Sequence, residues 1–91
     1  MNSQHYSIII PIYNEIKLIP SLLKYLKPYY EEGHEIIIVD DGSDDGSSNI
    51  LCDNKFVRLI IFKDNKGKGI AVKQGIQTVS YTHLRAHETP C

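Results

Sequence analysis

The amino-acid sequence predicts an α/β protein built on a parallel sheet. Three short runs rich in Ile and Val, at residues 7–12, 35–39 and 56–62, are largely apolar, as expected of strands covered on both faces. A segment with helical features follows each run, so the order is strand then helix, three times over. This order indicates βαβ units, and right-handed crossovers would bring the ends of all three strands to one edge of the sheet.

The first strand and helix are marked by proline and glycine. Pro11 cannot donate to a sheet hydrogen bond, so we expect it near the end of the strand at 7–12. Pro20 suits the first position of a helix. We expect Pro28 to distort the last turn of that helix and Gly33 to end it. A helical stripe of apolar residues lies between these points: Leu22, Leu23, Leu26, Tyr29 and Tyr30.

The second strand leads into an aspartate-rich loop, and the third into a lysine- and glycine-rich one. After the first of these loops, Ser43 or Asp44 can cap a short helix that includes Ile50 and Leu51. The second loop, KDNKGKG, precedes the third helix. We expect that helix to turn three residues inward: Ile70, Ala71 and Ile76.

The composition is that of one small globular domain. The chain has 91 residues, 42 % of them apolar and 23 % charged, with a net charge of −1, which predicts no nucleic-acid partner. Cys52 and Cys91 are too few for a disulfide framework and lack metal-ligand spacing. The start of the chain has no signal-peptide pattern, and no run approaches the roughly 20 apolar residues of a membrane span. We therefore expect a cytoplasmic location.

Residues 79–91 differ in character from the rest of the chain. The stretch VSYTHLRAHETPC is polar and continues no periodic pattern. Residues 79–89 match the translation of a transposon-type sequencing-library adapter, so we interpret residues 79–91 as a non-native tail and exclude them from functional reasoning. Residues 1–78 then form a partial domain.

Three segments are predicted to meet at the edge where the strands end. The first, PIYNE, offers the aromatic face of Tyr13 beside Glu15, and the second, VDDGS, offers the carboxylates of Asp40 and Asp41. The third, NKGKG, places glycines and Lys68 at a helix start, which favours phosphate. A stacking face, acceptors for base or sugar donors and a seat for an anion together predict a nucleotide-binding pocket.

Each of these features also has a purely structural interpretation. Tyr13 taken alone is more often a partly buried core residue, and Asp44 and Asp45 are better explained as a loop and helix start than as ligands. The glycines at 67 and 69 do not begin a dinucleotide-binding loop, because the next glycine is badly spaced and the loop follows the third strand. The functional interpretation depends on the features occurring together.

The three segments SIIIPIYNE, IIIVDDGSDDGS and NKGKGIAVKQGI together resemble the opening of family 2 glycosyltransferases, over about residues 6–77. The last segment is most similar to the polyprenyl-phosphate mannosyl- or glucosyltransferase branch. The resemblance implies a Rossmann-like parallel sheet, the truncated N-terminal part of a GT-A nucleotide-sugar-binding domain. It also implies transfer of a sugar, with inversion, from a UDP- or GDP-sugar to an acceptor hydroxyl or a polyprenyl phosphate. Such an acceptor implies peripheral association with the cytoplasmic face of a membrane.

By the same resemblance, seven residues would bind the nucleotide: Pro11, Tyr13, Glu15, Val39, Asp40, Asp41 and Lys68. The first three would line the nucleoside pocket. Val39 and Asp41 would contact the base, Asp41 by accepting from a ring N–H, while Asp40 would help to shape the site. Lys68 would lie near the phosphates.

The family resemblance further implies Mg²⁺ or Mn²⁺, held by a D-x-D motif at the end of the next core strand, and a catalytic base later still. No acidic pair follows Asp64 in this sequence, so we assign no catalytic and no metal-binding residue. We expect the chain alone to be inactive. We also expect the strand at 7–12, which would normally pair with a fourth strand, to present an open edge.

Two alternatives remain open at this stage. One is a receiver-like phosphoacceptor module, in which Asp64 would be phosphorylated; such modules also end a strand in an acidic pair, but normally after the first strand. The other is a nucleotide-binding module without transferase activity.

Overall fold

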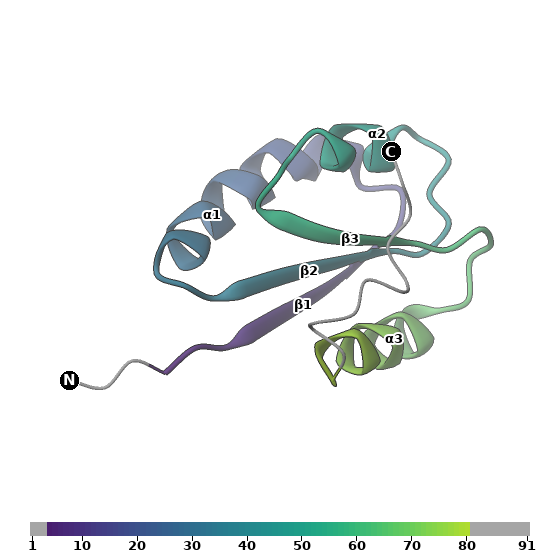
Figure 1. Cartoon of the computed structure of the whole chain (residues 1–91). Helices are drawn as coiled ribbons and strands as arrows, with labels where there is room; N and C mark the ends of the chain where they lie inside the picture. The colour runs from purple at the N-terminus through teal and green to yellow at the C-terminus, as the bar shows by residue number, and fades with distance from the viewer. Residues whose placement is uncertain (1–3, 81–91) are drawn as a thin grey trace.

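The computed structural model describes residues 4–80, which form a parallel sheet with helices on both faces (Figure 1). The predicted α/β class is confirmed. The elements, in chain order, are β1 (Ser7–Ile12), a 3₁₀ turn η1 (Ile16–Leu18), α1 (Ile19–Glu31), β2 (Glu35–Asp40), α2 (Ser47–Cys52), β3 (Val57–Ile61) and α3 (Lys68–Ser80). The strand boundaries differ from those expected by one residue at three ends.

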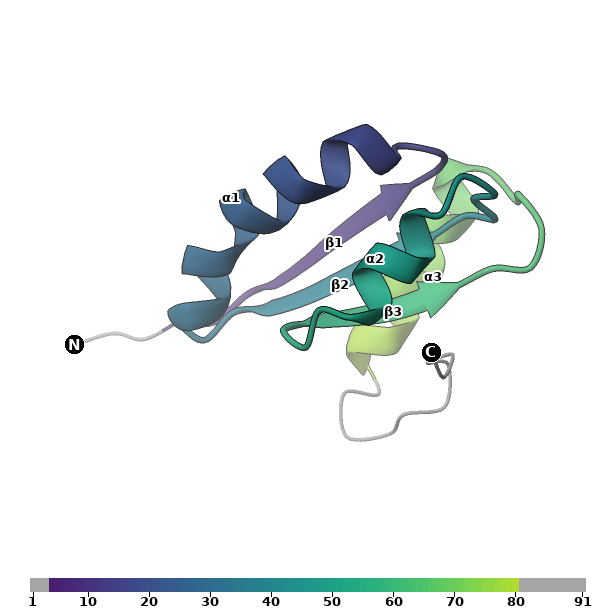
Figure 2. The ribbon, with the colours of Figure 1, turned by 90° about the horizontal axis from the view of Figure 1, so that it is seen from above.

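The three strands lie in the order β1-β2-β3, and both pairs are parallel. In the register of the sheet, Ile9 lies beside Ile37, and Ile37 beside Arg58. Helices α1 and α2 cover one face and α3 covers the other (Figures 1 and 2). Because all three strands run the same way, their carboxyl ends meet at one edge, as predicted.

Alternate residues of the strands supply two separate apolar cores, as the pleat of a strand requires. On the α1 and α2 face, the buried cluster consists of Ile12, Ile19, Leu26, Ile36, Ile38, Leu51 and Leu59. On the α3 face, it consists of Ile37, Val39, Ile60 and Ala71. The central strand β2 contributes to both clusters, which explains why its sequence is apolar at consecutive positions.

Helix α1 begins at Ile19, one residue before the predicted first position at Pro20, and ends where the sequence predicts. Pro20 lies in the first turn, and Pro28 lies inside the helix, which continues to Glu31. Gly33 follows with a φ of +101°, a conformation that glycine adopts without strain. Its N–H donates to the carbonyl of Tyr30, and the N–H of His34 donates to that of Tyr29. This pair of bonds is a Schellman motif, which ends the helix and turns the chain into β2.

The expected cap of α2 is wrong. The helix begins at Ser47, and Gly46 is the N-cap residue, with a φ of +93°. Neither Ser43 nor Asp44 lies at the cap, because the loop before the helix is longer than the spacing implied. The carboxylate of Asp45 instead accepts hydrogen bonds from the backbone N–H and the hydroxyl of Ser47, at 3.0 and 2.6 Å.

The expected inner face of α3 is also partly wrong. Ala71 is fully buried, but Ile70 and Ile76 are 51 and 54 % exposed. The face that meets the sheet carries Ala71, Gly75 and Thr78, which recur at helical spacing. A Cβ atom on Gly75 would overlap the Cγ2 methyl of Ile9. The helix therefore packs through small residues, and larger apolar residues on this face would hold it away from β1.

Within residues 4–80, β1 pairs with β2 alone, so its other edge is open and most of its residues are only half-buried. The open edge expected for this strand is thus present. No helix in the described part of the chain is long and apolar enough to cross a membrane. Of the predicted non-native tail, Val79 packs at the end of α3 against the second core cluster, while residues 81–91 lie outside the described residues. The origin of the tail stays a prediction.

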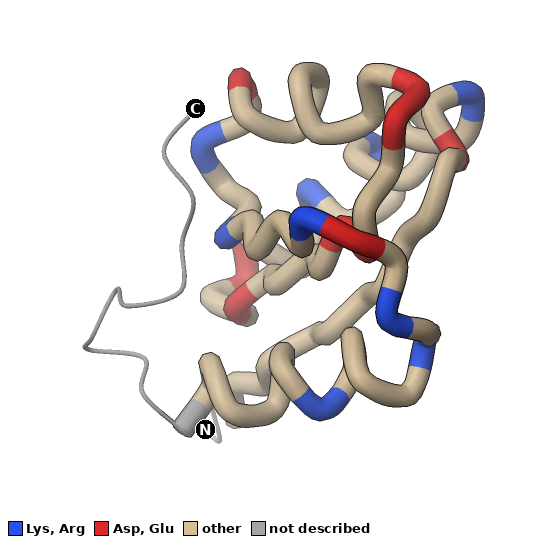
Figure 3. Tube along the Cα trace, turned by 90° about the vertical axis from the view of Figure 1, so that its right-hand side faces the viewer, with Lys and Arg blue, Asp and Glu red and all other residues tan. Residues whose placement is uncertain are grey.

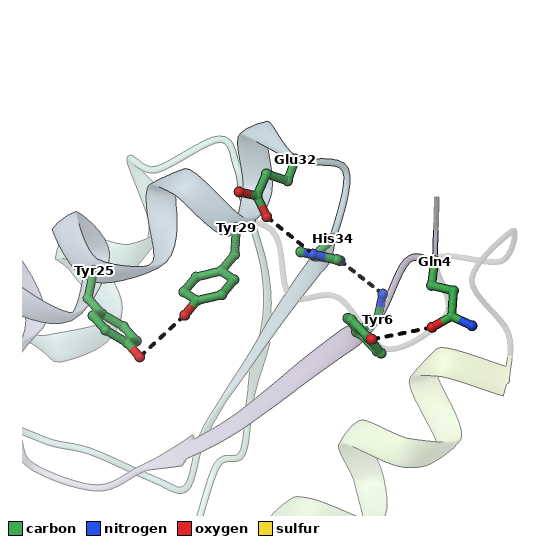
Figure 4. Close-up of polar contacts among 6 residues, drawn as sticks. All are labelled: Gln4, Tyr6, Tyr25, Tyr29, Glu32 and His34. Carbon is green, nitrogen blue, oxygen red and sulfur yellow. Dashed lines mark hydrogen bonds and ion pairs between the residues drawn. The ribbon is translucent and has the colours of Figure 1, made fainter. Parts of the chain in front are cut away.

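At the edge where the strands begin, His34 joins β1 to the α1–β2 turn (Figure 4). Its Nδ1 accepts the N–H of Tyr6 at 3.0 Å, and its Nε2 lies 3.6 Å from a carboxylate oxygen of Glu32. Nearby, the hydroxyls of Tyr25 and Tyr29 lie 3.5 Å apart, and this hydrogen bond raises the pKa of Tyr29. The bond from Tyr6 to His34 thus anchors the edge opposite the predicted nucleotide pocket.

Candidate nucleotide-binding site

A cleft of about 390 Å³ lies at the edge where the three strands end. Its lining residues are Pro11, Ile12, Tyr13, Glu15, Asp41, Asn65, Gly67 and Lys68. Residues from three distant segments therefore meet here, as the sequence predicts, and five of the seven predicted nucleotide-binding residues are among them. The volume is within the range of small-molecule sites in proteins.

The carboxylate of Asp41 organises this cleft. Its Oδ1 accepts the N–H of Lys66 at 2.7 Å, and its Oδ2 accepts the N–H of Gly67 at 2.9 Å. The side-chain amide of Asn65 adds bonds to Oδ2 at 3.2 Å and to the main-chain carbonyl of Asp41 at 3.1 Å. On the other side, the N–H of Asp41 donates to the carbonyl of Ile12. Asp41 thus joins the loop after β3 to the end of β1.

Gly42 lets the loop after β3 approach this closely. Its φ is +83°, and a Cβ atom placed there would lie 2.7 Å from the backbone nitrogen of Asn65 and 2.8 Å from the carbonyl carbon of Asp64. Any side chain at this position would have to push the loop away from Asp41. The glycine of the DDGS segment is therefore explained by a close backbone contact.

Asp40 and Val39 do not line the cleft. Both are completely buried, and the side chain of Val39 packs in the core beneath α3. The Oδ1 atom of Asp40 accepts the N–H of Ser43 at 2.9 Å, whereas its buried Oδ2 has no hydrogen-bond partner among residues 4–80. The position of Asp40 suits the role of shaping the loop. The proposed base contact of Val39 stays a prediction, without support from the side chain's position.

The segment that carries Tyr13 and Glu15 is held in place by the aspartate-rich loop. The N–H of Asn14 donates to the hydroxyl of Ser43, and the N–H of Asp44 donates to the side-chain carbonyl of Asn14, both at 2.8 Å. Asn14 has a φ of +51°, which asparagine tolerates better than most residues. These two reciprocal bonds fix the turn after β1.

Asp45 completes the connection between the two loops. Its Oδ2 accepts the N–H of Ile16 at 3.0 Å, while its Oδ1 binds Ser47 at the start of α2. The hydrogen bond from the Ser47 hydroxyl, followed by those from backbone N–H groups, lowers the pKa of Asp45. Asp44 and Asp45 thus serve the loop and the helix start, which confirms their structural interpretation.

The cleft combines the features of a nucleotide site. Tyr13 is 47 % exposed, so its ring is available for stacking, and Glu15 is exposed beside it. Lys68 lies on the first turn of α3, where the positive end of the helix dipole also favours an anion. Figure 3 views the molecule from this edge and shows acidic and basic segments gathered there. Asp64, the residue that a receiver-like module would phosphorylate, is not among the residues that line the cleft.

The described residues do not form a metal site. Within residues 4–80, no group of three or more His, Cys, Asp or Glu side chains is placed to hold a metal ion. The cleft itself offers the carboxylates of Glu15 and Asp41, and that of Asp41 is already bonded to the loop at 65–67. Mg²⁺ and Mn²⁺ need about six oxygen ligands, of which these two carboxylates could supply only part, with water or substrate phosphates supplying the rest.

Three lining residues, Ile12, Asn65 and Gly67, were not among the seven predicted nucleotide-binding residues. Asn65 lies within the NKGKG segment, so its neighbourhood was predicted but its contact with Asp41 was not. Asn65 and Asp41 are separated by 24 positions in the sequence. An asparagine next to a lysine and glycine loop is too common a pattern to indicate such a bond.

Comparisons with known proteins point to one family. Residues 7–84 match the family described as Glycosyl transferase family 2. The chain is 36 % identical over 92 aligned positions to dolichyl-phosphate beta-glucosyltransferase of Saccharomyces cerevisiae, an alignment that covers 87 % of this chain and 26 % of the relative. The human protein of the same name is 33 % identical over 88 positions, covering 81 % of this chain and 27 % of the relative.

A bacterial relative has a different sugar and lipid in its name. The undecaprenyl-phosphate 4-deoxy-4-formamido-L-arabinose transferase of Pseudomonas syringae pv. syringae is 38 % identical over 80 positions, covering 78 % of this chain and 23 % of the relative. This chain therefore spans about a quarter of the length of the curated relatives that it matches.

Proposed function

This chain belongs to glycosyl transferase family 2, and on that premise we propose that its cleft binds the nucleotide of a nucleotide-sugar donor. In the longer protein of which this chain would be a part, called the parent protein below, the sugar of a UDP- or GDP-sugar would be transferred with inversion to an acceptor hydroxyl or a polyprenyl phosphate. The names of three relatives, which include dolichyl phosphate or undecaprenyl phosphate, support the polyprenyl acceptor.

The observation that carries the proposal is the meeting of Tyr13, Asp41 and Lys68 around one cleft. The ring of Tyr13 offers a face for a base, and stacking of this kind contributes about 1–3 kcal/mol per base. Asp41 is held in place by three donors from the loop at 65–67, so its remaining acceptor capacity has a fixed direction. Lys68 and the N–H groups at the start of α3 supply positive potential for phosphate.

We further propose Mg²⁺ or Mn²⁺ as the cofactor of the parent protein, where it would offset the charge of the diphosphate leaving group. The residues described here supply no complete ligand set for it. A polyprenyl phosphate resides in a lipid bilayer, so we propose that the parent protein works peripherally at the cytoplasmic face of a membrane. Sedimentation with lipid vesicles would test that association.

The proposal is tested by measuring nucleotide affinity with matched pairs of variants. UDP and GDP are titrated into the chain by isothermal calorimetry. Tyr13→Ala and Lys68→Ala should each weaken binding of the nucleotide that binds, Tyr13→Ala by roughly tenfold. Two substitutions of the same kind serve as controls, Tyr25→Ala on the exposed face of α1 and Lys73→Ala on α3, since neither residue lines the cleft.

Binding that is lost in the Tyr13 and Lys68 variants and kept in both controls supports the proposal. The proposal is wrong if neither nucleotide binds, or if Tyr13→Ala and Lys68→Ala behave like their controls.

A further inference from the structure

The carboxylate of Asp41 meets the cleft with most of its acceptor positions already in use. Its Oδ1 accepts one hydrogen bond, from the N–H of Lys66 at 2.7 Å. Its Oδ2 accepts two, from the N–H of Gly67 at 2.9 Å and the side-chain amide of Asn65 at 3.2 Å. An ionised carboxylate offers about four acceptor positions, two on each oxygen. Three are therefore filled by the loop, and one position on Oδ1 remains.

We propose that Asn65 is a positioning residue that sets nucleotide selectivity, because it leaves Asp41 a single acceptor for the base. The inference rests on the proposed function, binding of a nucleotide in this cleft. A single acceptor suits a base edge with one N–H, the imide of uracil or thymine. Guanine presents a ring N–H and an exocyclic amino group side by side, and a carboxylate pairs with both only by using its two oxygens.

Of the three donors to the carboxylate of Asp41, Asn65 is the one that a side-chain substitution can remove. Lys66 and Gly67 donate from the backbone, so a change of side chain does not remove their bonds. Asn65 donates from its side chain, and its second bond, to the main-chain carbonyl of Asp41 at 3.1 Å, fixes which end of its amide meets the carboxylate. Because both partners on Asp41 are acceptors, the NH₂ group and not the oxygen must lie against it. Asn65 is also exposed, so its replacement leaves the core intact.

The filled position has a calculable consequence for affinity. A guanine bound at the edge of Asp41 would leave one of its two donors without a partner in a partly desolvated site. Unpaired polar groups of this kind weaken binding roughly tenfold to hundredfold. Inosine diphosphate lacks the exocyclic amino group but keeps the ring N–H, so it should avoid this penalty while matching guanosine diphosphate in size.

The experiment compares affinities for UDP, GDP and inosine diphosphate by isothermal calorimetry. The unaltered chain should bind inosine diphosphate more tightly than GDP, and UDP more tightly than GDP. Asn65→Ala should shift the ratio of UDP to GDP affinity toward GDP by roughly tenfold, because Oδ2 regains an acceptor position. Asn54→Ala is the matched control: Asn54 accepts the N–H of Phe56 in the loop before β3, outside the cleft, so this ratio should not change.

The possible failures are distinguishable. If no nucleoside diphosphate binds, the proposed function is wrong and the inference falls with it. If nucleotides bind but GDP and inosine diphosphate bind equally, and Asn65→Ala does not shift the UDP to GDP ratio, the nucleotide site stands and the role of Asn65 is wrong. Should the Asn65 variant fail to fold, the comparison of GDP with inosine diphosphate on the unaltered chain decides alone.

Discussion

Replacing Gly42 by alanine should destabilise the protein more than any other single glycine-to-alanine change in the loops around the cleft. Two effects add at this position. The φ of +83° is unfavourable for an L-residue by about 1–2 kcal/mol. The new Cβ atom would also lie 2.7 Å from the backbone nitrogen of Asn65, and relieving such an overlap in a packed region typically costs a further 1–3 kcal/mol or so. We therefore expect a loss of about 2–5 kcal/mol.

Two neighbouring glycines separate these effects. Gly67 has a φ of +98° but no atom within 4 Å of its hypothetical Cβ, so Gly67→Ala should show the backbone effect alone, about 1–2 kcal/mol. Gly69 has neither a positive φ nor a close neighbour, and it lies in α3. Gly69→Ala should therefore be neutral or stabilise the helix by up to about 1 kcal/mol.

Thermal and urea unfolding of the three variants measure this order. A loss of 1 kcal/mol lowers the midpoint temperature by roughly 4–8 °C for a domain of this size. Nucleotide affinity should also fall for Gly42→Ala, because its overlap moves the loop that holds Asp41. The reasoning is refuted if Gly42→Ala is no less stable than Gly67→Ala, since the close contact would then carry no energy.

Three further predictions follow from the fold and the site. Gly75→Ala should destabilise the domain by about 1–3 kcal/mol in urea unfolding, because its Cβ would overlap Ile9. In the double variant, Ile9→Ala should recover part of that loss, and strictly additive losses would contradict the contact. The pKa of Asp45 is lowered in the folded protein, so the stability that its carboxylate contributes is complete above the unfolded pKa of 3.8 and is lost as the pH falls through the folded pKa. Asp45→Asn should therefore reduce the loss of folding stability on acidification. If stability falls with pH as steeply in this variant as in the unaltered chain, the carboxylate of Asp45 is not the cause. We also expect the chain to bind a nucleotide without transferring sugar, because its sequence has no acidic pair after Asp64 that could serve as the D-x-D motif. Sugar transfer by the purified chain in a radiolabelled nucleotide-sugar assay would overturn this expectation.

Most of the secondary structure could be predicted because it depends on local patterns. The apolar runs of the strands, the prolines of α1 and the glycine at its end act through nearby residues, and each lies where the sequence places it. The cap of α2 and the inner face of α3 could not be predicted in the same way. Both depend on distances between elements: Asp45 also bonds the N–H of Ile16, 29 positions away, and Gly75 is required by Ile9 of β1.

The order of the elements and the edge at which the candidate site forms were determined by the sequence alone, because parallel βαβ units leave one place where all strands end. The family resemblance implied different roles for the two adjacent aspartates, but only the tertiary structure gave the physical reason. Successive residues at the end of a strand point to opposite sides, so the carboxylate of Asp40 is turned into the protein while that of Asp41 reaches the cleft. Hydrogen bonds from Asn65, Lys66 and Gly67 determine which acceptor position of Asp41 stays free. These bonds exist only once β2 and β3 are paired.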